Sequence, residues 1–199
     1  MADHEYGRRG NNEGARSVSM TVRDQQAAVD PGLFRRVMGR FATGVTVITA
    51  EAEDGVRGMT ANAFMSGSLT PPLCIISVAT KARLHDALKK TVHFGVSMLA
   101  QGQEEISQHF AGQGVAQPDL CFEHLAGVPV LSGVSAVIAA RIEARHACGD
   151  HSLFIGHILG MREEGRPPLV FHGGKYATLH YRKTMPADQV VDFWELVHE

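Results

Sequence analysis

The sequence predicts a mainly β protein, an antiparallel barrel with a few helices. About eight short apolar segments are bounded by the turn residues Gly, Asp and Pro, and most of their connections are short enough for hairpins. Strands and helices do not alternate regularly along the chain, as they do in parallel sheets. These observations favour a closed antiparallel barrel over a parallel sheet.

The first expected element is an amphipathic helix over residues 30–44. Asp30 suits the N-cap, Pro31 the first helical position, and Gly44 the end of the helix. Its apolar face would comprise Leu33, Phe34, Val37, Met38 and Phe41. Residues 1–28 precede it and contain little to bury, so we expect a disordered tail there.

The strands follow from apolar runs and turn signals. Asp54-Gly55 predicts a tight hairpin between the first two strands, and the continuous apolar run of residues 73–79 predicts a strand buried on both faces, with Cys74 as a core thiol. Residues 134–147 alternate apolar and charged side chains, as in a half-exposed strand. The expected strands are residues 45–50, 56–61, 73–79, 94–99, 134–147 and 152–162, then two short strands within 169–181 joined at Gly173-Gly174.

Two short helices are expected between the strands, at residues 82–91 and 102–112. A helical extension is expected at residues 184–199, following a single folded domain over residues 29–183. Its apolar residues recur at helical spacing, so they would pack either on a partner subunit or back on the same barrel. These apolar residues are Val190, Val191, Trp194 and Val197.

Composition and charge exclude several classes of function. The 19 basic and 21 acidic residues give a net charge of -2, so the chain has no basic field for nucleic acid. No apolar run approaches the roughly 20 residues that span a membrane, and the N-terminus lacks the apolar segment of a signal peptide. Three widely spaced cysteines do not form a disulfide framework, which favours the cytoplasm.

Common catalytic and nucleotide-binding motifs are absent from the sequence. It has neither a G-x-G-x-x-G nor a P-loop motif, and neither the serine hydrolase nor the zinc protease pattern. His146, Cys148 and His151 lie together in HACGDH, but convergence on a metal is possible and unforced there, and a hairpin tip explains the run as well. We therefore expect no metal site.

The segment GMTANAFMSGSLTPPL, residues 58–73, has the composition of a ligand-lining stretch. Thr60, Ala61, Asn62 and Ala63 lie where a strand ends, and their small side chains would let a flat heterocycle approach the backbone closely. A polar turn with satisfied caps is the alternative for this segment taken alone.

Five segments in register resemble the short-chain flavin reductase family. They are TGVTVIT at 43–49, GMTANAFMSGSLTPPLCIISV at 58–78, HFGVSML at 93–99, GDH at 149–151 and FHGGKY at 171–176. The resemblance runs from about Leu33 to Leu179. It implies an FMN-binding split barrel, usually a homodimer, that uses NADH or NADPH to reduce FMN or FAD. The reduced flavin commonly goes to a separate oxygenase component.

The resemblance also implies site residues. The stretch Thr60 to Ser66 would follow the isoalloxazine ring and the ribityl chain, and SVATKAR, residues 77–83, would meet the flavin phosphate. Lys81 and Arg83, at the start of a predicted helix, suit an anion, although a solvated helix face is the alternative. The expected cofactor-binding residues are Thr60, Ala61, Asn62, Ala63, Ser66, Ser77, Thr80, Lys81, Ala82, Arg83, Gly174 and Tyr176.

Many members of the family carry serine where this chain has Ala82, so the hydroxyl at the phosphate would come from Thr80. His151 is the expected catalytic residue, which would orient the nicotinamide near the turn at Gly173-Gly174; a solvated residue at the turn is the alternative. Two other functions remain open: a non-catalytic flavin or haem binder on the same barrel, and a flavin oxidase resembling the pyridoxamine phosphate oxidase group.

Overall fold

The structure is a computed structural model that describes residues 29–114 and 118–180. The predicted N-terminal tail and the predicted C-terminal helical extension lie outside the described residues. In the described ranges, no helix is long and apolar enough to cross a membrane.

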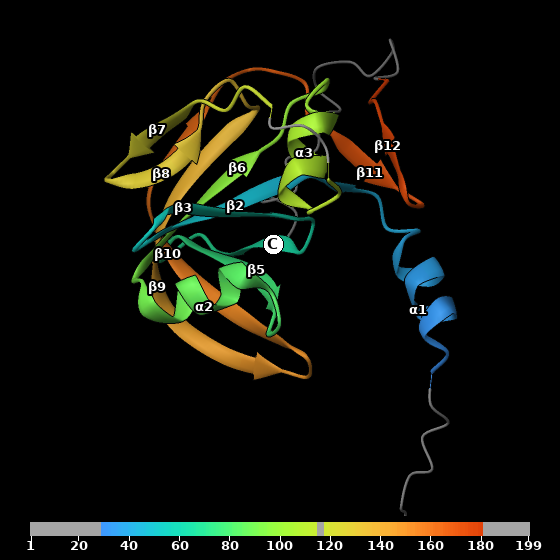
Figure 1. The fold of residues 1–199 in the computed structure, drawn as a ribbon, viewed down its shortest axis with the longest axis horizontal. Coiled ribbons are helices and arrows are strands. Elements are labelled where there is room, and N and C mark those ends of the chain that lie inside the picture. Colours follow the sequence, from blue (N-terminus) through green and yellow to red (C-terminus); the bar gives the residue numbers. More distant parts are fainter. Residues whose placement is uncertain (1–28, 115–117, 181–199) are drawn as a thin grey trace, which may run out of the picture.

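The main element is a seven-stranded antiparallel sheet that curls into a barrel (Figure 1). Its strand order is β3-β2-β6-β9-β10-β5-β4, so β3 and β4 are the two edges and do not pair with each other. Only Asn62 and Ala63 separate these two edge strands along the chain. The barrel is therefore not closed but split between β3 and β4, as the family resemblance implies. We call this opening between the two edge strands the seam. The strands are β2 (Thr46–Ala52), β3 (Gly55–Ala61), β4 (Phe64–Ser68), β5 (Leu73–Ala79), β6 (His93–Met98), β9 (Ala136–Cys148) and β10 (His151–Glu163).

Two small sheets complete the β structure. One contains β1 (Thr43–Gly44), β11 (Val170–His172) and β12 (Lys175–Ala177), and the other pairs β7 (Phe122–Leu125) with β8 (Val128–Leu131). The described part of the chain thus holds more strands than the eight or so that the sequence predicts. The additional strands β1, β4, β7 and β8 are short or rich in small residues, and depend on pairing with distant segments or across tight turns.

The helices are α1 (Pro31–Met38), α2 (Arg83–Lys90) and α3 (Glu104–Phe110). Asp30 caps α1 as predicted, because its carboxylate accepts the Gly32 and Leu33 amides at 3.0 Å each. The predicted end at Gly44 is wrong: Gly39 is the C-cap, and Gly44 pairs with Val170 in the β1-β11 ladder. Pairing with a distant strand thus shortens the helix.

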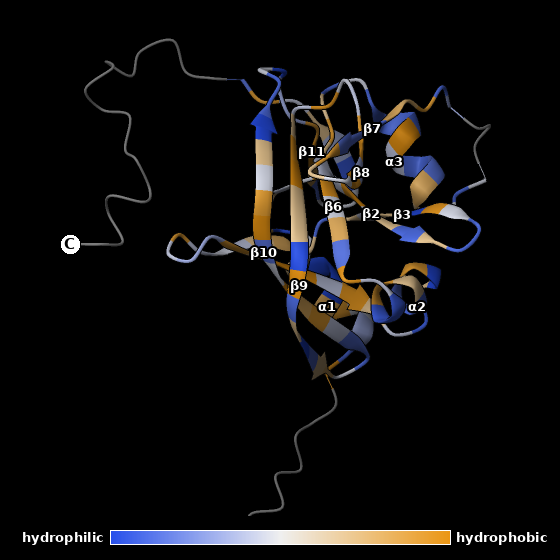
Figure 2. Ribbon diagram, turned by 90° about the vertical axis from the view of Figure 1, so that its left-hand side faces the viewer, coloured by the Kyte–Doolittle hydropathy of each residue, from blue (hydrophilic) through white to orange (hydrophobic). Residues whose placement is uncertain are grey.

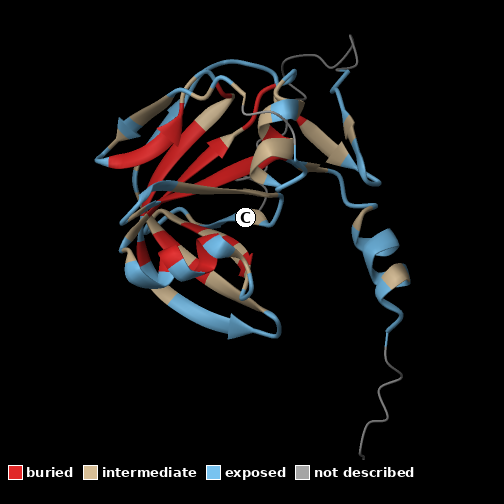
Figure 3. Cartoon of the chain, in the orientation of Figure 1, coloured by how far each residue is buried: buried red, intermediate tan, exposed pale blue. Residues whose placement is uncertain are grey.

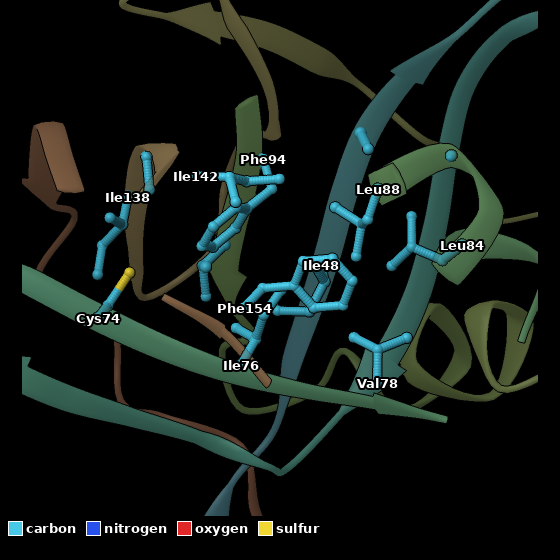
Figure 4. Close-up of a cluster of buried hydrophobic side chains, with 14 residues drawn as sticks. Ile48, Cys74, Ile76, Val78, Leu84, Leu88, Phe94, Ile138, Ile142 and Phe154 are labelled. Atoms are coloured by element: carbon cyan, nitrogen blue, oxygen red, sulfur yellow. The ribbon is translucent and has the colours of Figure 1, made fainter. Parts of the chain in front are cut away.

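The buried side chains form two clusters on opposite faces of the central strands (Figure 3). Phe94, Phe154 and Ile48 point toward one another inside the barrel (Figure 4), while the neighbouring Val47 belongs to the second cluster. A β-carbon on Gly156 would lie 2.5 Å from the Phe94 ring, so the glycine makes room for this ring.

The long strand β9 is half-exposed, as predicted, and Figure 2 shows it passing from a hydrophobic stretch to one that contains hydrophilic residues. Its first part is buried on both faces because it crosses between the two clusters, whereas Arg141 and Glu143 are exposed. The prediction for residues 73–79 is only half right. Cys74, Ile76 and Val78 are buried, and the residues between them are half-buried because that face lies toward the outside. Burial raises the pKa of the Cys74 thiol to about 11, in keeping with an inert core thiol.

Candidate flavin and nicotinamide site

Three segments that are distant in sequence meet at the C-terminal end of β5. The Ser77 amide donates to the Ala63 carbonyl at 3.1 Å, which holds the β3-β4 connection against β5. Ala79 pairs with His151 in the β5-β10 ladder. The Thr80 amide and hydroxyl both donate to the Asp150 carbonyl, at 2.9 and 3.1 Å. The fold thus brings the predicted flavin segment, the predicted phosphate segment and the G-D-H turn to one place.

The middle of the predicted flavin segment is exposed at the seam. Asn62 and Ala63 are exposed. The side-chain amide of Asn62 makes no hydrogen bond to any residue of the described ranges. Ala61 is fixed from behind, because the Thr46 hydroxyl donates to its carbonyl at 2.6 Å. Ser66 lies on the exposed edge strand β4, opposite Cys74. This arrangement leaves the small or polar side chains of Asn62, Ala63 and Ser66 exposed at the seam.

His151 is held by its neighbour in sequence. Its Nδ1 lies 2.7 Å from Asp150 Oδ1, and this hydrogen bond keeps the pKa of the Asp150 carboxyl below its usual value. An ionised carboxylate only accepts, so Nδ1 carries the hydrogen. Within the residues that the structure describes, Nε2 makes no hydrogen bond and is free to meet a ligand. The imidazole is 42% exposed, which suits an open site as well as a solvated turn.

The start of α2 retains features of an anion site. Ala82 occupies the N-cap and provides no side-chain cap, so the first backbone amides of the helix lack that partner. The Thr80 hydroxyl donates to the Asp150 carbonyl in this structure. It would have to break this hydrogen bond to donate to the flavin phosphate in place of the family's serine.

The two predicted basic phosphate ligands lie in different surroundings. The positive charge of Lys81 acts on Asp150 and helps to lower its pKa, so Lys81 belongs to the G-D-H side of the helix. Arg83 lines two cavities on the side of β3. Of the two residues, Lys81 acts on Asp150 of the G-D-H turn, and Arg83 lines the cavities beside β3.

Thr60 and Tyr176 are connected through a residue that the sequence did not single out. The Thr60 hydroxyl donates to the Ser107 carbonyl at 2.6 Å, and the Tyr176 hydroxyl donates to Ser107 Oγ at 3.0 Å. Ser107 is 2% exposed and lies on α3. No local pattern distinguishes it from the other polar residues of this helix, because its role depends on the packing of three elements. Both predicted hydroxyls are therefore engaged in holding the site together.

Gly174 and Tyr176 lie in the β11-β12 hairpin, away from the turn that carries His151 (Figure 1). The Phe171 and Tyr176 rings pack edge to face with centroids 5.6 Å apart. The Gly173 amide donates to the Gly39 carbonyl at 2.8 Å and ties this hairpin to the end of α1. The single chain does not bring this hairpin beside His151.

Two cavities flank Arg83. The larger, about 950 Å³, lies between the β2-β3 hairpin and α2, and the smaller, about 530 Å³, lies between β3, the start of α2 and the end of α3. Neither of these two cavities is lined by Asn62, Ser66 or His151. In the described ranges, no group of three or more His, Cys, Asp or Glu residues could hold a metal ion.

Comparison with known proteins identifies the family of this chain. Residues 38–180 match the family described as the flavin reductase like domain. The chain is 40% identical over 165 residues to an NADH-dependent flavin reductase of Rhodococcus sp, a match that covers 81% of this chain and 94% of the relative. It is 39% identical over 151 residues to the reductase component of 4-hydroxyphenylacetate 3-monooxygenase of Thermus thermophilus, covering 73% and 95%.

A solved structure agrees with this family. The flavin reductase PheA2 in its native state superposes with a TM-score of 0.74 at 43% identity, covering 76% of this chain and 99% of that one. Both the sequence and the fold therefore match over nearly the whole length of the relatives. The chain belongs to the flavin reductase family.

Proposed function

We infer that this protein is an NADH-dependent flavin reductase that supplies reduced flavin to a separate monooxygenase component. Its relatives include NADH-dependent flavin reductases and the reductase component of a monooxygenase. The observation that carries the inference is the meeting of Ala63, Ser77, Thr80 and His151 at the end of β5. The flavin and the nicotinamide supply the hydride chemistry, and the protein binds and orients them.

The seam between β3 and β4 suits a flat flavin ring. Small side chains at Ala61 and Ala63 allow close approach, and the free amide of Asn62 can donate to and accept from a heterocycle edge. The flavin phosphate would lie at the start of α2, where backbone amides and Lys81 favour negative charge. These contacts do not distinguish FMN from FAD, because both molecules carry a phosphate on the ribityl chain.

His151 would orient the nicotinamide. The Asp150 carboxylate fixes hydrogen on Nδ1, which leaves the Nε2 lone pair to accept from an N–H of the carboxamide. No proton needs to leave the protein in the hydride step, so orientation suffices for a catalytic role. The names of the relatives favour NADH as the donor.

Steady-state assays distinguish this function from the two alternatives. We expect NADH oxidation that depends on added FMN or FAD. A non-catalytic binder would retain flavin and oxidise no NADH, and an oxidase would consume oxygen with an amine substrate in the absence of NADH. Either result would contradict the reductase.

We also propose that the protein works as a homodimer, because none of the other residues that the structure describes buries the apolar face of α1. Helix α1 contains no buried residue, and its predicted apolar face is between 49% and 75% exposed (Figure 3). These five side chains are Leu33, Phe34, Val37, Met38 and Phe41. Such a continuous apolar face usually packs on a partner.

The position of α1 connects the dimer to the site. Its C-cap, Gly39, accepts from Gly173 of the β11-β12 hairpin, so a partner seated on α1 would also adjoin Gly174 and Tyr176. Light scattering at micromolar concentration should give twice the chain mass, and Phe34→Asp should give the single-chain mass. A monomeric wild type would contradict this proposal without touching the reductase.

The three free thiols support a further proposal, that the protein works in the reducing cytoplasm. Cys121 and Cys148 are exposed and Cys74 is buried, and none of the three pairs with another.

A further inference from the structure

The two cavities beside Arg83 differ in charge. Four carboxylates line the larger one against three basic residues, and two of the basic residues are already paired there, Arg57 with Asp54 and Lys90 with Glu53 at 3.8 Å. An anion would meet net negative charge in this cavity. The larger cavity is therefore a solvated groove of ion pairs and a poor site for a phosphate.

The smaller cavity has the opposite character. Arg57 and Arg83 line it, and no carboxylate does. Its remaining walls include Val56, Met59 and the Phe110 ring, with His109 packed edge to face on Phe110 at a centroid distance of 5.0 Å. A volume of about 530 Å³ with apolar walls, aromatic rings and two cations suits a flat heterocycle that carries phosphate.

The two arginines approach this cavity from different elements. Arg57 comes from β3, and its Nε donates to Asp54 Oδ1 at 3.1 Å while a second nitrogen donates to Oδ2. This pair fixes the guanidinium plane and uses two of its five N–H groups, which leaves three for a ligand. Arg83 is the first residue of α2 and forms no ion pair with any residue in the described ranges. Both arginines line this one cavity, and we call the two the arginine fork.

The smaller cavity adjoins the proposed flavin site. Its wall residues Gly58 and Met59 precede Thr60 directly, and Phe110 packs over Gly58, where a β-carbon would lie 2.4 Å from the ring. Phe110 belongs to the helix that holds the Thr60 hydroxyl through Ser107. The smaller cavity therefore lies beside the start of the proposed flavin segment.

We propose that the smaller cavity binds the adenosine diphosphate half of a dinucleotide, with Arg57 and Arg83 on its phosphates and the adenine against His109 and Phe110. The proposal rests on the proposed function, in which two such molecules, FAD and NADH, are available. Both carry this chemistry, and FMN carries neither the second phosphate nor the adenine. The cavity therefore gives the enzyme a means to prefer FAD over FMN, or to hold NADH.

The test combines two variants with a matched control. Arg57→Ala removes one cation of the arginine fork, and Val56→Trp fills the cavity from a partly exposed strand position. Lys90→Ala removes a positive charge from α2 that lines only the larger cavity. Calorimetry with ADP, fluorescence titration with FAD and FMN, and the KM for NADH with FMN as acceptor are measured for each.

We expect Arg57→Ala and Val56→Trp to weaken ADP binding about tenfold or more, the loss expected for a charge-assisted contact, while Lys90→Ala leaves it unchanged. A parallel loss for FAD alone identifies the flavin dinucleotide as the source, and a parallel rise in the KM for NADH alone identifies the nicotinamide dinucleotide. Equal losses for FAD and FMN, or wild-type ADP affinity in both cavity variants, overturn the proposal. If the wild type oxidises no NADH with any flavin, the reductase fails, and ADP binding still tests the cavity.

Discussion

Ser107 is the residue through which the structure predicts coupling between Thr60 and Tyr176. Its hydroxyl accepts from Tyr176 and its carbonyl accepts from Thr60, and it is 2% exposed. A neutral hydrogen bond contributes about 1 kcal/mol net to the free energy of unfolding. Ser107→Ala and Tyr176→Phe each remove the same hydroxyl contact, so each should lower this free energy by about 1 kcal/mol.

The double-variant cycle provides the decisive measurement. Because both substitutions remove one shared bond, the double variant should lose about 1 kcal/mol as well, which is a coupling energy of about 1 kcal/mol. Thr60→Val removes a different bond, to the Ser107 carbonyl, so its effect should add to that of Tyr176→Phe. Urea denaturation followed by circular dichroism gives the free energy of unfolding of the wild type, the three single variants and the two double variants.

Two results would refute this reasoning. Additive losses for Ser107→Ala and Tyr176→Phe would show that the two hydroxyls do not share a bond in solution. Flavin binding gives an independent check, because the hydrogen bond between Thr60 and Ser107 holds the start of the predicted flavin segment. All three single variants should therefore raise the Kd for flavin by a few fold, and an unchanged Kd would separate Ser107 from the site.

The other predictions concern the ligands and pH. His151→Ala should slow flavin reduction or raise the KM for NADH and leave the Kd for oxidised flavin nearly unchanged, since only the nicotinamide loses its guide; stopped-flow reduction that matches the wild type would remove His151 from the site. Lys81→Ala should weaken FMN binding about tenfold and riboflavin binding much less, because a charge-assisted bond to phosphate contributes about 1.5 to 3 kcal/mol; equal losses would place the phosphate elsewhere. His85 is buried against Phe154 and Ser152, and desolvation lowers its pKa from the ordinary value of 6.5. The unfolded chain then binds the extra proton first, so stability should fall as the pH drops below about 6.5, down to the lowered pKa of the folded chain. A His85→Gln variant should lose part of this pH dependence in urea titrations at pH 5 and 8, and an unchanged slope would contradict the assignment.

The sequence by itself determined the elements whose signals are local. The Asp30 cap and the Asp54-Gly55 hairpin need only neighbouring residues, and both are present as predicted. The alternation along β9 is present only in its middle, because the first part of the strand is buried on both faces. The family also follows from short segments in register, because all five segments lie within residues 38–180, which match the family. The predicted roles of individual site residues remain predictions.

Only the tertiary structure decided how these stretches combine. The strand β4 is short, ends in the small residues Ser66, Gly67 and Ser68, and depends on pairing with β5. Helix α1 ends early, and Gly44 instead pairs with a strand more than a hundred residues away. The Ser107 contacts and the cavity between Arg57 and Arg83 likewise join segments that no local pattern relates. The physical reason is the same in each case. A hydrogen bond or a cavity wall depends on which backbones lie side by side, and the sequence encodes that only through the packing of the whole barrel.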